Sequence, residues 1–222
     1  LGHQELIKRT VKLADKLGLV PTLICFDPDP IDVINNKKTK HIISYKNRIK
    51  TIEYYGIKQI IVIKFNRNIM NLSPKSFIDN YLNKMNIRHL VCGFDFSFGY
   101  KGLGNVELLK KYCKFDLSVV PELKYYGRKI SSTNIKENIV KGNFKRVNRE
   151  LGYNYYIEVK VEKCSKKGSK WLIEANLVDN ECILPSDGIY SGNIEINNNK
   201  IHMLSPRKMN IGRIILTEIY EY

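Results

Sequence analysis

The sequence predicts an α/β protein in which a parallel β-sheet with flanking helices is followed by a smaller antiparallel β domain. Two observations support this prediction. Up to Gly152, short apolar runs typical of buried strands alternate with segments of helical periodicity, which is the order that builds a parallel sheet. After Gly152 the apolar residues alternate with polar ones, as in antiparallel strands. We therefore expect two domains, residues 1–152 and residues 153–222.

The first half of the α/β region consists of two helix–strand pairs. Apolar side chains recur at helical spacing over residues 4–17, and residues 20–26 form a short apolar run. Prolines at 28 and 30 end this run because they lack the amide donor that a strand interior requires. A second helix is predicted over 44–55, and an Ile/Val-rich strand over 59–65.

The second half repeats the alternation. Ser73 followed by Pro74 is typical of a helix start, and we expect this helix to reach Met85. A short strand over 89–92, a glycine-rich loop, a helix over 106–112 and a strand over 117–120 follow. Ligands of parallel α/β sheets bind beyond the carboxyl ends of the strands. We therefore expect the loops 27–30, 93–104 and 121–133 to converge.

The antiparallel region holds short alternating runs separated by polar turns. The runs are residues 155–161, 171–173, 189–196, 201–203 and 214–219. A domain of about 70 residues with several short strands is typical of a small β-barrel.

Composition limits the classes of function. The chain has 222 residues and 43% hydrophobic residues, which excludes a disordered protein, and it lacks the apolar run of about 18 residues that a membrane span needs. Five cysteines without C-x-x-C spacing argue against a zinc site or a disulfide framework and predict a reducing, cytoplasmic location. The net charge of +15 is compatible with nucleic acid, anionic lipid or phosphorylated ligands, or with a general bias toward lysine.

The first candidate motif is Gly2-His3 at the start of the first predicted helix. Free backbone amides at a helix start attract anions, and glycine lets a phosphate approach closely. A lone histidine at this place is also a common surface residue.

The second candidate is the loop of residues 93–104, which contains four glycines and several aromatic side chains. Asp95 can accept a hydrogen bond from an adenine amino group or a ribose hydroxyl, and aromatic side chains can stack on flat rings. An ordinary apolar loop with glycines at its turns is the equal alternative.

The third candidate is the run from Lys129 to Lys136, Lys-Ile-Ser-Ser-Thr-Asn-Ile-Lys. Hydroxyl groups at a helix start between two lysines suit a phosphate group. Serine and threonine are also favoured there as structural helix caps, and for this motif taken alone the structural cap is the preferred interpretation.

Together with the loop at 27–30, these segments resemble the prokaryotic bifunctional riboflavin kinase/FAD synthetase family. The adenylyltransferase domain of that family carries H-x-G-H, F-x-P-H-P, G-x-D-F-x-F-G-x-x-x-x-G and K-I-S-S-T-x-I-R, in this order. The sequence has counterparts at residues 2–3, 26–30, 93–104 and 129–136. Four ordered motifs are much harder to meet by chance than one. The resemblance implies a Rossmann-like nucleotidyltransferase sheet followed by a small antiparallel β-barrel.

The resemblance also implies a reaction and a set of site residues. AMP is transferred from ATP to FMN, which gives FAD and pyrophosphate, and Mg²⁺ arrives with ATP and bridges its phosphates. His3 is the implied catalytic residue. The implied ATP-binding residues are Gly2, His3, Gly93, Asp95, Lys129, Ser132, Thr133 and Lys136. The implied FMN-binding residues are Asp27, Pro28, Phe96 and Phe98.

The sequence departs from the family pattern at several places in this region. The first histidine of H-x-G-H is absent from the sequence together with the first strand, and we expect both to precede Leu1. Asp29 stands where the family has histidine, which adds negative charge near an anionic ligand. Lys136 replaces arginine and loses its bidentate fork, and Asn105 replaces aspartate.

The largest departure lies in the second domain. The kinase motif of the family is G-x-P-T-A-N, and the aligned segment here is residues 171–176, in which Glu174 replaces the threonine. The chain also lacks room for the later stretch that carries the catalytic glutamate of the kinase. We expect residues 153–222 to be a shortened barrel without riboflavin kinase activity.

These observations favour an FMN adenylyltransferase with ATP and FMN as substrates and with no membrane or nucleic-acid partner. Three alternatives stay open. The protein is an ordinary bifunctional enzyme whose kinase tolerates the altered motif, a non-catalytic flavin- or RNA-binding regulator on the same scaffold, or a nucleotidyltransferase that uses another phosphate acceptor.

Overall fold

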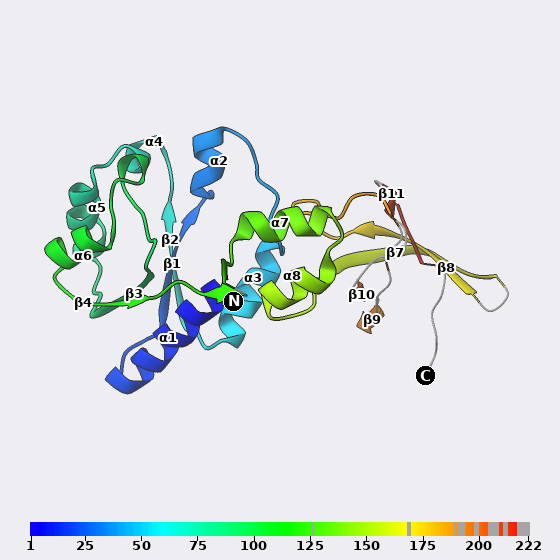
Figure 1. Cartoon of the computed structure of the whole chain (residues 1–222), viewed down its shortest axis with the longest axis horizontal. Helices are drawn as coiled ribbons and strands as arrows, with labels where there is room; N and C mark the ends of the chain where they lie inside the picture. Colours follow the sequence, from blue (N-terminus) through cyan, green and yellow to red (C-terminus); the bar gives the residue numbers. More distant parts are fainter. Residues whose placement is uncertain are drawn as a thin grey trace. The chain divides into compact units, whose positions relative to one another are not determined.

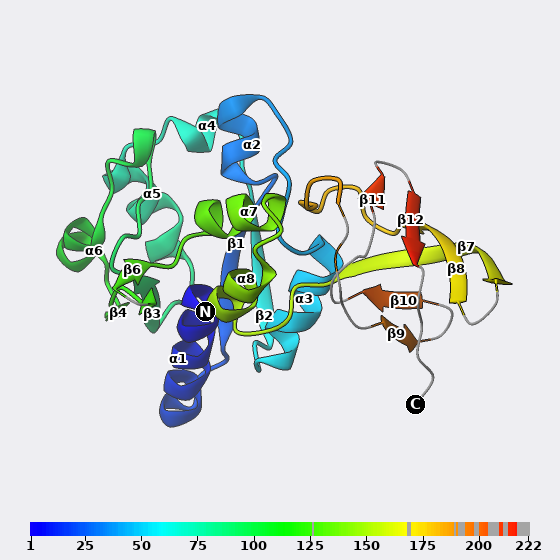
Figure 2. The ribbon, with the colours of Figure 1, turned by 45° about the vertical axis from the view of Figure 1, so that its right-hand side comes forward.

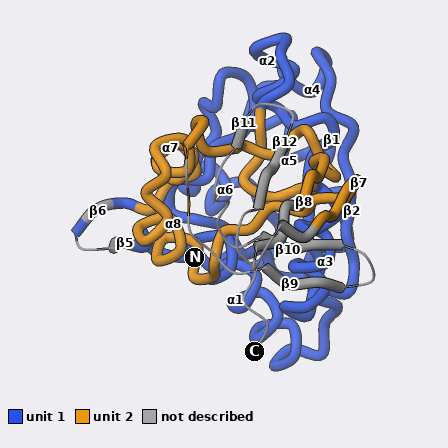
Figure 3. Tube along the Cα trace, turned by 90° about the vertical axis from the view of Figure 1, so that its right-hand side faces the viewer, with its two compact units in different colours: residues 1–39, 45–129 blue, residues 40–44, 130–222 orange. Residues whose placement is uncertain are grey.

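The computed structural model describes residues 1–125, 127–167, 170–188, 190, 194–197, 200–203, 209–210 and 213–216. The chain forms two compact units (Figure 3). Unit 1 consists of residues 1–39 and 45–129, and unit 2 consists of residues 40–44 and 130–222. The short segment 40–44 belongs to unit 2 because the amide of His41 donates a hydrogen bond to the carbonyl of Glu181. The domain boundary near residue 152 stays a prediction.

Unit 1 contains parallel strands and the helices that connect them (Figure 1). Its helices are α1 Gly2–Leu17, α2 Pro30–Asn35, α3 Tyr45–Tyr54, α4 Arg67–Met70, α5 Pro74–Asn80 and α6 Val106–Tyr112, with single 3₁₀ turns η1 Leu82–Lys84 and η2 Tyr100–Gly102. Its strands are β1 Thr22–Asp27, β2 Gln59–Lys64, β3 His89–Gly93, β4 Asp116–Val120, β5 Lys124–Tyr125 and β6 Arg128–Lys129.

Strands β1 to β4 of unit 1 form parallel ladders, as the sequence predicts, whereas the short strands β5 and β6 pair antiparallel. β1 pairs with β2 from Thr22 opposite Gln59, and β3 pairs with β4 from His89 opposite Asp116. Among the described strands these are two separate two-stranded ladders rather than one continuous sheet. The short helices α2 and α4 lie at the carboxyl ends of β1 and β2 (Figure 1), which is the side where ligands of such sheets bind.

The core of unit 1 lies between these ladders and helices α5 and α6. Ile78 of α5 and Leu109 of α6 are completely buried. Phe77 packs beside them, with its ring centroid 5.7 Å from that of Phe98. Burial of such side chains contributes about 1.5–3 kcal/mol each, so this core holds the glycine-rich loop that carries Phe98 against α5.

Unit 2 begins with two helices and continues as an antiparallel sheet (Figure 2). Its elements are α7 Ser132–Val140, α8 Phe144–Leu151, β7 Ile157–Lys167, β8 Lys170–Leu177, β9 Ile194–Asn197, β10 Lys200–Met203, β11 Met209–Asn210 and β12 Arg213–Leu216. The strand order is β11-β12-β8-β7-β10-β9. Antiparallel pairing agrees with the sequence. The end strands β11 and β9 are not paired with each other in the described part of the chain, so a closed barrel is not confirmed.

The core of unit 2 joins the helix pair to the sheet. Ile139 of α7, Val147 of α8 and Val159 of β7 are fully buried in one cluster. Tyr155 completes it: its ring stacks on Phe144 with centroids 5.7 Å apart, and its hydroxyl donates a hydrogen bond to the carbonyl of Ile183. This packing holds the α7–α8 pair against the sheet, and it thereby fixes the start of α7. Nowhere in the described ranges is a helix long and apolar enough to cross a membrane.

Candidate functional site

His3 lies in the first turn of α1, where the backbone amides of the helix start are free to face an anion. Neighbouring protein atoms remove part of its ring from water, and this is the main reason why the pKa of His3 lies below its ordinary value of 6.5. The positive charge of Arg48 acts in the same direction, whereas Asp95 opposes it. The lowered pKa favours the neutral imidazole in the free protein.

Arg48 of α3 is one of the charged residues that act on His3, although no sequence motif marks it. Its charge lowers the pKa of His3 and also acts on Cys25 of β1, which in turn feels the carboxylate of Asp27. Arg48 therefore lies within electrostatic range of α1 and of the carboxyl end of β1. No motif surrounds it in the sequence, and only the packing of α3 brings it here.

Asp95 and Lys129 form an ion pair that joins the glycine-rich loop to β6. The Lys129 Nζ donates to Asp95 Oδ2 over 2.6 Å, and it also lies 5.2 Å from the ring centroid of Phe94. The hydrogen bond lowers the pKa of the Asp95 carboxyl and raises the pKa of Lys129. Both side chains are about half exposed, 51% and 48%, so water screens the pair and it stabilises the fold only weakly. A phosphate can therefore compete with Asp95 for Lys129.

The aromatic residues of the glycine-rich loop divide between core and surface. Phe98 is only 7% exposed and packs between Phe96 and Phe77. Phe96 is half-buried, and Phe94 is 43% exposed. Phe98 is thus chiefly a core residue, and the sequence pattern of alternating phenylalanines did not reveal which of them faces solvent.

The loop closes on itself at Gly104. The amide of Gly104 donates to the carbonyl of Phe98, and the amide of Phe98 donates to the carbonyl of Gly104. A Cβ atom at Gly104 would lie 2.6 Å from the carbonyl oxygen of Phe98 and 2.7 Å from the Phe98 ring. This close approach explains the glycine at the end of the motif and fixes the loop around Asp95.

Two departures from the family pattern are helix caps. Asp29 Oδ1 accepts a hydrogen bond from the amide of Ile31 and caps α2. Asn105 Oδ1 accepts from the amide of Leu108 and caps α6. Aspartate and asparagine are both strong helix caps, so both residues have a local structural role.

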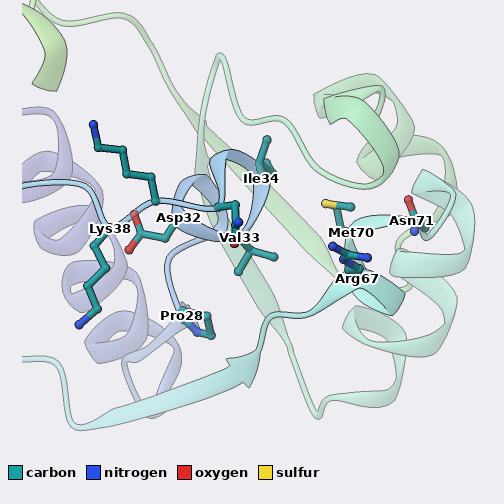
Figure 4. A pocket seen from close by; sticks show the side chains of 10 residues that line it. Pro28, Asp32, Val33, Ile34, Lys38, Arg67, Met70 and Asn71 are labelled. Carbon is teal, nitrogen blue, oxygen red and sulfur yellow. The ribbon is translucent and has the colours of Figure 1, made fainter.

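A pocket of about 760 Å³ lies in unit 1 beside Pro28 (Figure 4). Val33 and Ile34 of α2 and Met70 of α4 provide apolar surface. The rest of its lining is polar or basic: Asp32, Asn36, Lys37, Lys38, Arg67 and Asn71. An apolar surface with three cations around it suits a flat ring system that carries negative charge.

The remaining predicted residues belong to unit 2. Ser131 caps α7 by accepting a hydrogen bond from the amide of Asn134, and Ser132 and Thr133 follow with exposed side chains. Thr133 and Lys136 line a second pocket of about 340 Å³ on this unit, together with Glu137, Val140, Lys141 and Ile183.

Within unit 1 the structure brings His3, Asp95 and Lys129 together, with Gly2 beside His3 and Gly93 at the end of β3. The described residues contain no group of three or more His, Cys, Asp or Glu side chains that could hold a metal ion. A Mg²⁺ ion that keeps several water ligands and takes substrate phosphates needs no such group.

Several known proteins resemble this chain over most of its length. The family model described as FAD synthetase matches residues 1–134. A bifunctional riboflavin kinase/FMN adenylyltransferase from Listeria monocytogenes is 33% identical over 203 residues, which cover 89% of this chain and 65% of that protein. An FAD synthetase from the same organism is 29% identical over 213 residues, covering 90% of this chain and 80% of that protein.

A solved structure has the same overall fold. It is described as the macrolide-efflux protein from Streptococcus pneumoniae, with a TM-score of 0.82 and 25% identity over 100% of this chain and 82% of that chain.

A bifunctional riboflavin kinase/FMN adenylyltransferase from Bacillus subtilis is 33% identical over 203 residues, which cover 89% of this chain and 64% of that protein. The chain thus spans slightly less than two thirds of these bifunctional relatives, 65% and 64%.

Proposed function

The chain belongs to the FAD synthetase family, and on this premise we propose that it is an FMN adenylyltransferase. An oxygen of the FMN phosphate attacks the α-phosphorus of ATP, the bond from that phosphorus to the bridging oxygen of the β-phosphate breaks, and FAD and pyrophosphate result. The attacking oxygen is already anionic, so no general base is required. Catalysis then depends on alignment of the two phosphates and on neutralisation of charge.

The observation that carries the proposal is the group formed by His3, Asp95 and Lys129 in the part of the chain that the family model matches. These residues come from the start of α1, the loop after β3 and strand β6. Three segments distant in sequence supply an imidazole, a carboxylate and an ammonium group to one place, which is the set of groups that an adenylyl transfer can use.

His3 is the proposed catalytic residue. Its lowered pKa leaves it neutral before ATP binds, and the negative charge of the phosphates then favours its protonation. An imidazolium donor stabilises the charge that develops on the phosphate oxygens in the transition state. Gly2 leaves room for the phosphates beside the helix start.

The other proposed ATP-binding residues supply charge and hydrogen bonds. Lys129 exchanges Asp95 for a phosphate oxygen, and Asp95 and Gly93 then face the adenosine. Ser132, Thr133 and Lys136 provide two hydroxyls and one ammonium for the phosphates. Mg²⁺, bound to the phosphates and water, supplies further charge neutralisation.

For FMN we propose the side of unit 1 formed by Asp27, Pro28, Phe96 and Phe98. The pocket beside Pro28 supports this assignment, because its apolar wall suits the flavin ring and its cations suit an anionic ligand. Phe98 acts there through Phe96, whose ring stacks on it at 5.5 Å.

We further propose that residues 1–152 form the adenylyltransferase domain, that residues 153–222 form a shortened barrel without kinase activity, and that the protein works in the cytoplasm. The free state of all five cysteines fits a reducing compartment.

The test is to incubate the purified full-length protein, with the residues that precede Leu1, with FMN, ATP and Mg²⁺ and to measure FAD and pyrophosphate. We expect both products in equal amounts. A His3→Ala variant should lower turnover about 10²-fold, the effect of losing one donor to transition-state charge. If no FAD forms but RNA binds with a steep dependence on salt, the regulator hypothesis replaces this proposal.

A further inference from the structure

The buried face of α7 contains a polar residue, Asn138, at a position where the neighbouring side chains are apolar. Ile135 and Ile139 are 4% and 0% exposed, and Asn138 between them is 6% exposed. Asparagine is a weaker helix former than leucine because its side chain competes for backbone hydrogen bonds. The position therefore carries a cost in helix stability that the core does not require.

The Asn138 side chain connects the two ends of α7. Its Nδ2 donates to the carbonyl of Asn134 over 2.8 Å and to Asn134 Oδ1 over 3.1 Å. Its Oδ1 accepts from Nδ2 of Asn143, which lies in the turn before α8, over 3.1 Å. The Asn143 amide returns to the carbonyl of Asn138 over 2.9 Å.

These bonds continue to the beginning of the helix. The amide of Asn134 donates to Oγ of the cap residue Ser131 over 3.2 Å. Ser132 and Thr133 therefore lie between Ser131 and Asn134, two residues that are fixed by these hydrogen bonds. Their own side chains stay exposed and available to a ligand.

We propose that Asn138 is a positioning residue for the phosphate-binding turn of α7, an inference that rests on the proposed function. It fixes the direction of the first turn, so that the hydroxyls of Ser132 and Thr133 are set before ATP arrives. A turn that is ordered in advance loses less conformational freedom on binding, which raises affinity.

The variant that tests this is Asn138→Leu. Leucine has the same number of side-chain heavy atoms and the same branching at Cγ, suits the apolar face and favours the helix, while Asn134 and Asn143 are not buried and can turn to water. We expect N138L to melt at or above the temperature of the wild type. Its Kd for Mg·ATP, measured by calorimetry, should rise about tenfold because the hydroxyls lose their orientation. Its Kd for FMN, measured by flavin fluorescence, should stay unchanged.

A matched control is Asn148→Leu on α8. Asn148 Oδ1 accepts from the amide of Tyr155 over 2.8 Å and its Nδ2 donates to Asn154, so its bonds lead away from the start of α7. N148L should lower the melting temperature and leave the affinity for ATP unchanged. If N138L does not fold, Asn138→Ala removes the same bonds without adding volume, and the same rise in Kd is expected.

The inference is wrong if the Kd of N138L for ATP stays within about twofold of the wild type, or if N148L weakens ATP as strongly. A wild-type chain that binds ATP but makes no FAD contradicts the proposed function alone, since the Kd comparison still decides the role of Asn138. A wild-type chain that binds no ATP overturns both.

Discussion

At the scale of single residues, the ionisable groups of the candidate site shift one another's pKa values. Partial burial and, to a smaller extent, the charge of Arg48 lower the pKa of His3, and the hydrogen bond from Lys129 lowers the pKa of the Asp95 carboxyl. An arriving polyphosphate reverses part of this balance: it attracts Lys129 away from Asp95 and favours a proton on His3. Binding of ATP and protonation of His3 are thus linked.

This linkage predicts that ATP binding takes up protons. The pKa of His3 is lowered in the free protein and should be raised in the complex. Between these two pKa values the complex holds more protons than the free protein, so the affinity for ATP increases as the pH falls through that interval. Calorimetry in two buffers of different ionisation enthalpy measures the uptake directly.

His3→Asn is the control for this prediction, because asparagine keeps a hydrogen-bond donor and cannot titrate. The variant should show no proton uptake at this site and a flatter dependence of affinity on pH. Arg48→Ala should leave the proton uptake at pH 7 smaller, because the free His3 then starts from a higher pKa. An unchanged uptake in H3N would assign the proton to another group.

The residues of the motifs could be predicted from the sequence, but their contacts could not. The spacing of the motifs marks His3, Asp95 and Lys129, yet the ion pair between the last two depends on how β6 approaches the loop after β3. Arg48 has no motif at all. The burial of Phe98 depends on Phe77, a helix residue that no local pattern connects with it.

At the scale of elements, predictability did not follow length: the short helix α6 and the strands β1 to β4 were predicted, whereas three other helices were not. Helix α6 begins and ends at the predicted residues 106 and 112, and the strands β1 to β4 lie within about two residues of their predicted positions. No prediction covered α2, α4 and α8. In α8, Phe144, Val147 and Leu151 have the spacing of one helix face over two turns, so the sequence did carry the signal for this helix. The other two are shorter and depend on their caps.

The cap of α2 leads to a prediction about Asp29. Asp29→Ala should lower the free energy of unfolding by about 1 kcal/mol, because the amide of Ile31 loses its acceptor. Asp29→Ser should retain most of the stability, since serine is also a cap. Urea denaturation followed by circular dichroism measures the difference. Equal stability of the alanine and serine variants would show that the cap does not stabilise α2.

At the scale of the whole molecule, the charge of +15 acquires a more specific meaning. In unit 1, Lys37, Lys38 and Arg67 line one pocket, while Lys129 lies at the candidate ATP site. These cations stand where small phosphorylated ligands would bind, so the charge does not require a nucleic-acid partner. The sequence alone could not separate these cations from the general excess of lysine, because the pocket depends on how α2 and α4 follow the strands.

The same scale provides the last prediction, which concerns the second region of the chain. Relatives named as bifunctional extend beyond the 65% of their length that this chain spans. In the aligned segment here, Glu174 replaces the threonine of the kinase motif, and the Asn176 side chain is engaged by Glu162 across β7 and β8. A carboxylate repels the phosphates that a threonine would bind, and the side chain of Asn176 is already bound to Glu162.

Riboflavin and ATP with Mg²⁺ should therefore give no FMN under conditions in which FMN and ATP give FAD, as chromatography of the flavins will show. Glu174→Thr should not restore the activity by itself, because Asn176 remains bound to Glu162. Formation of FMN by the unaltered chain would instead establish a working kinase in residues 153–222 and make the protein bifunctional.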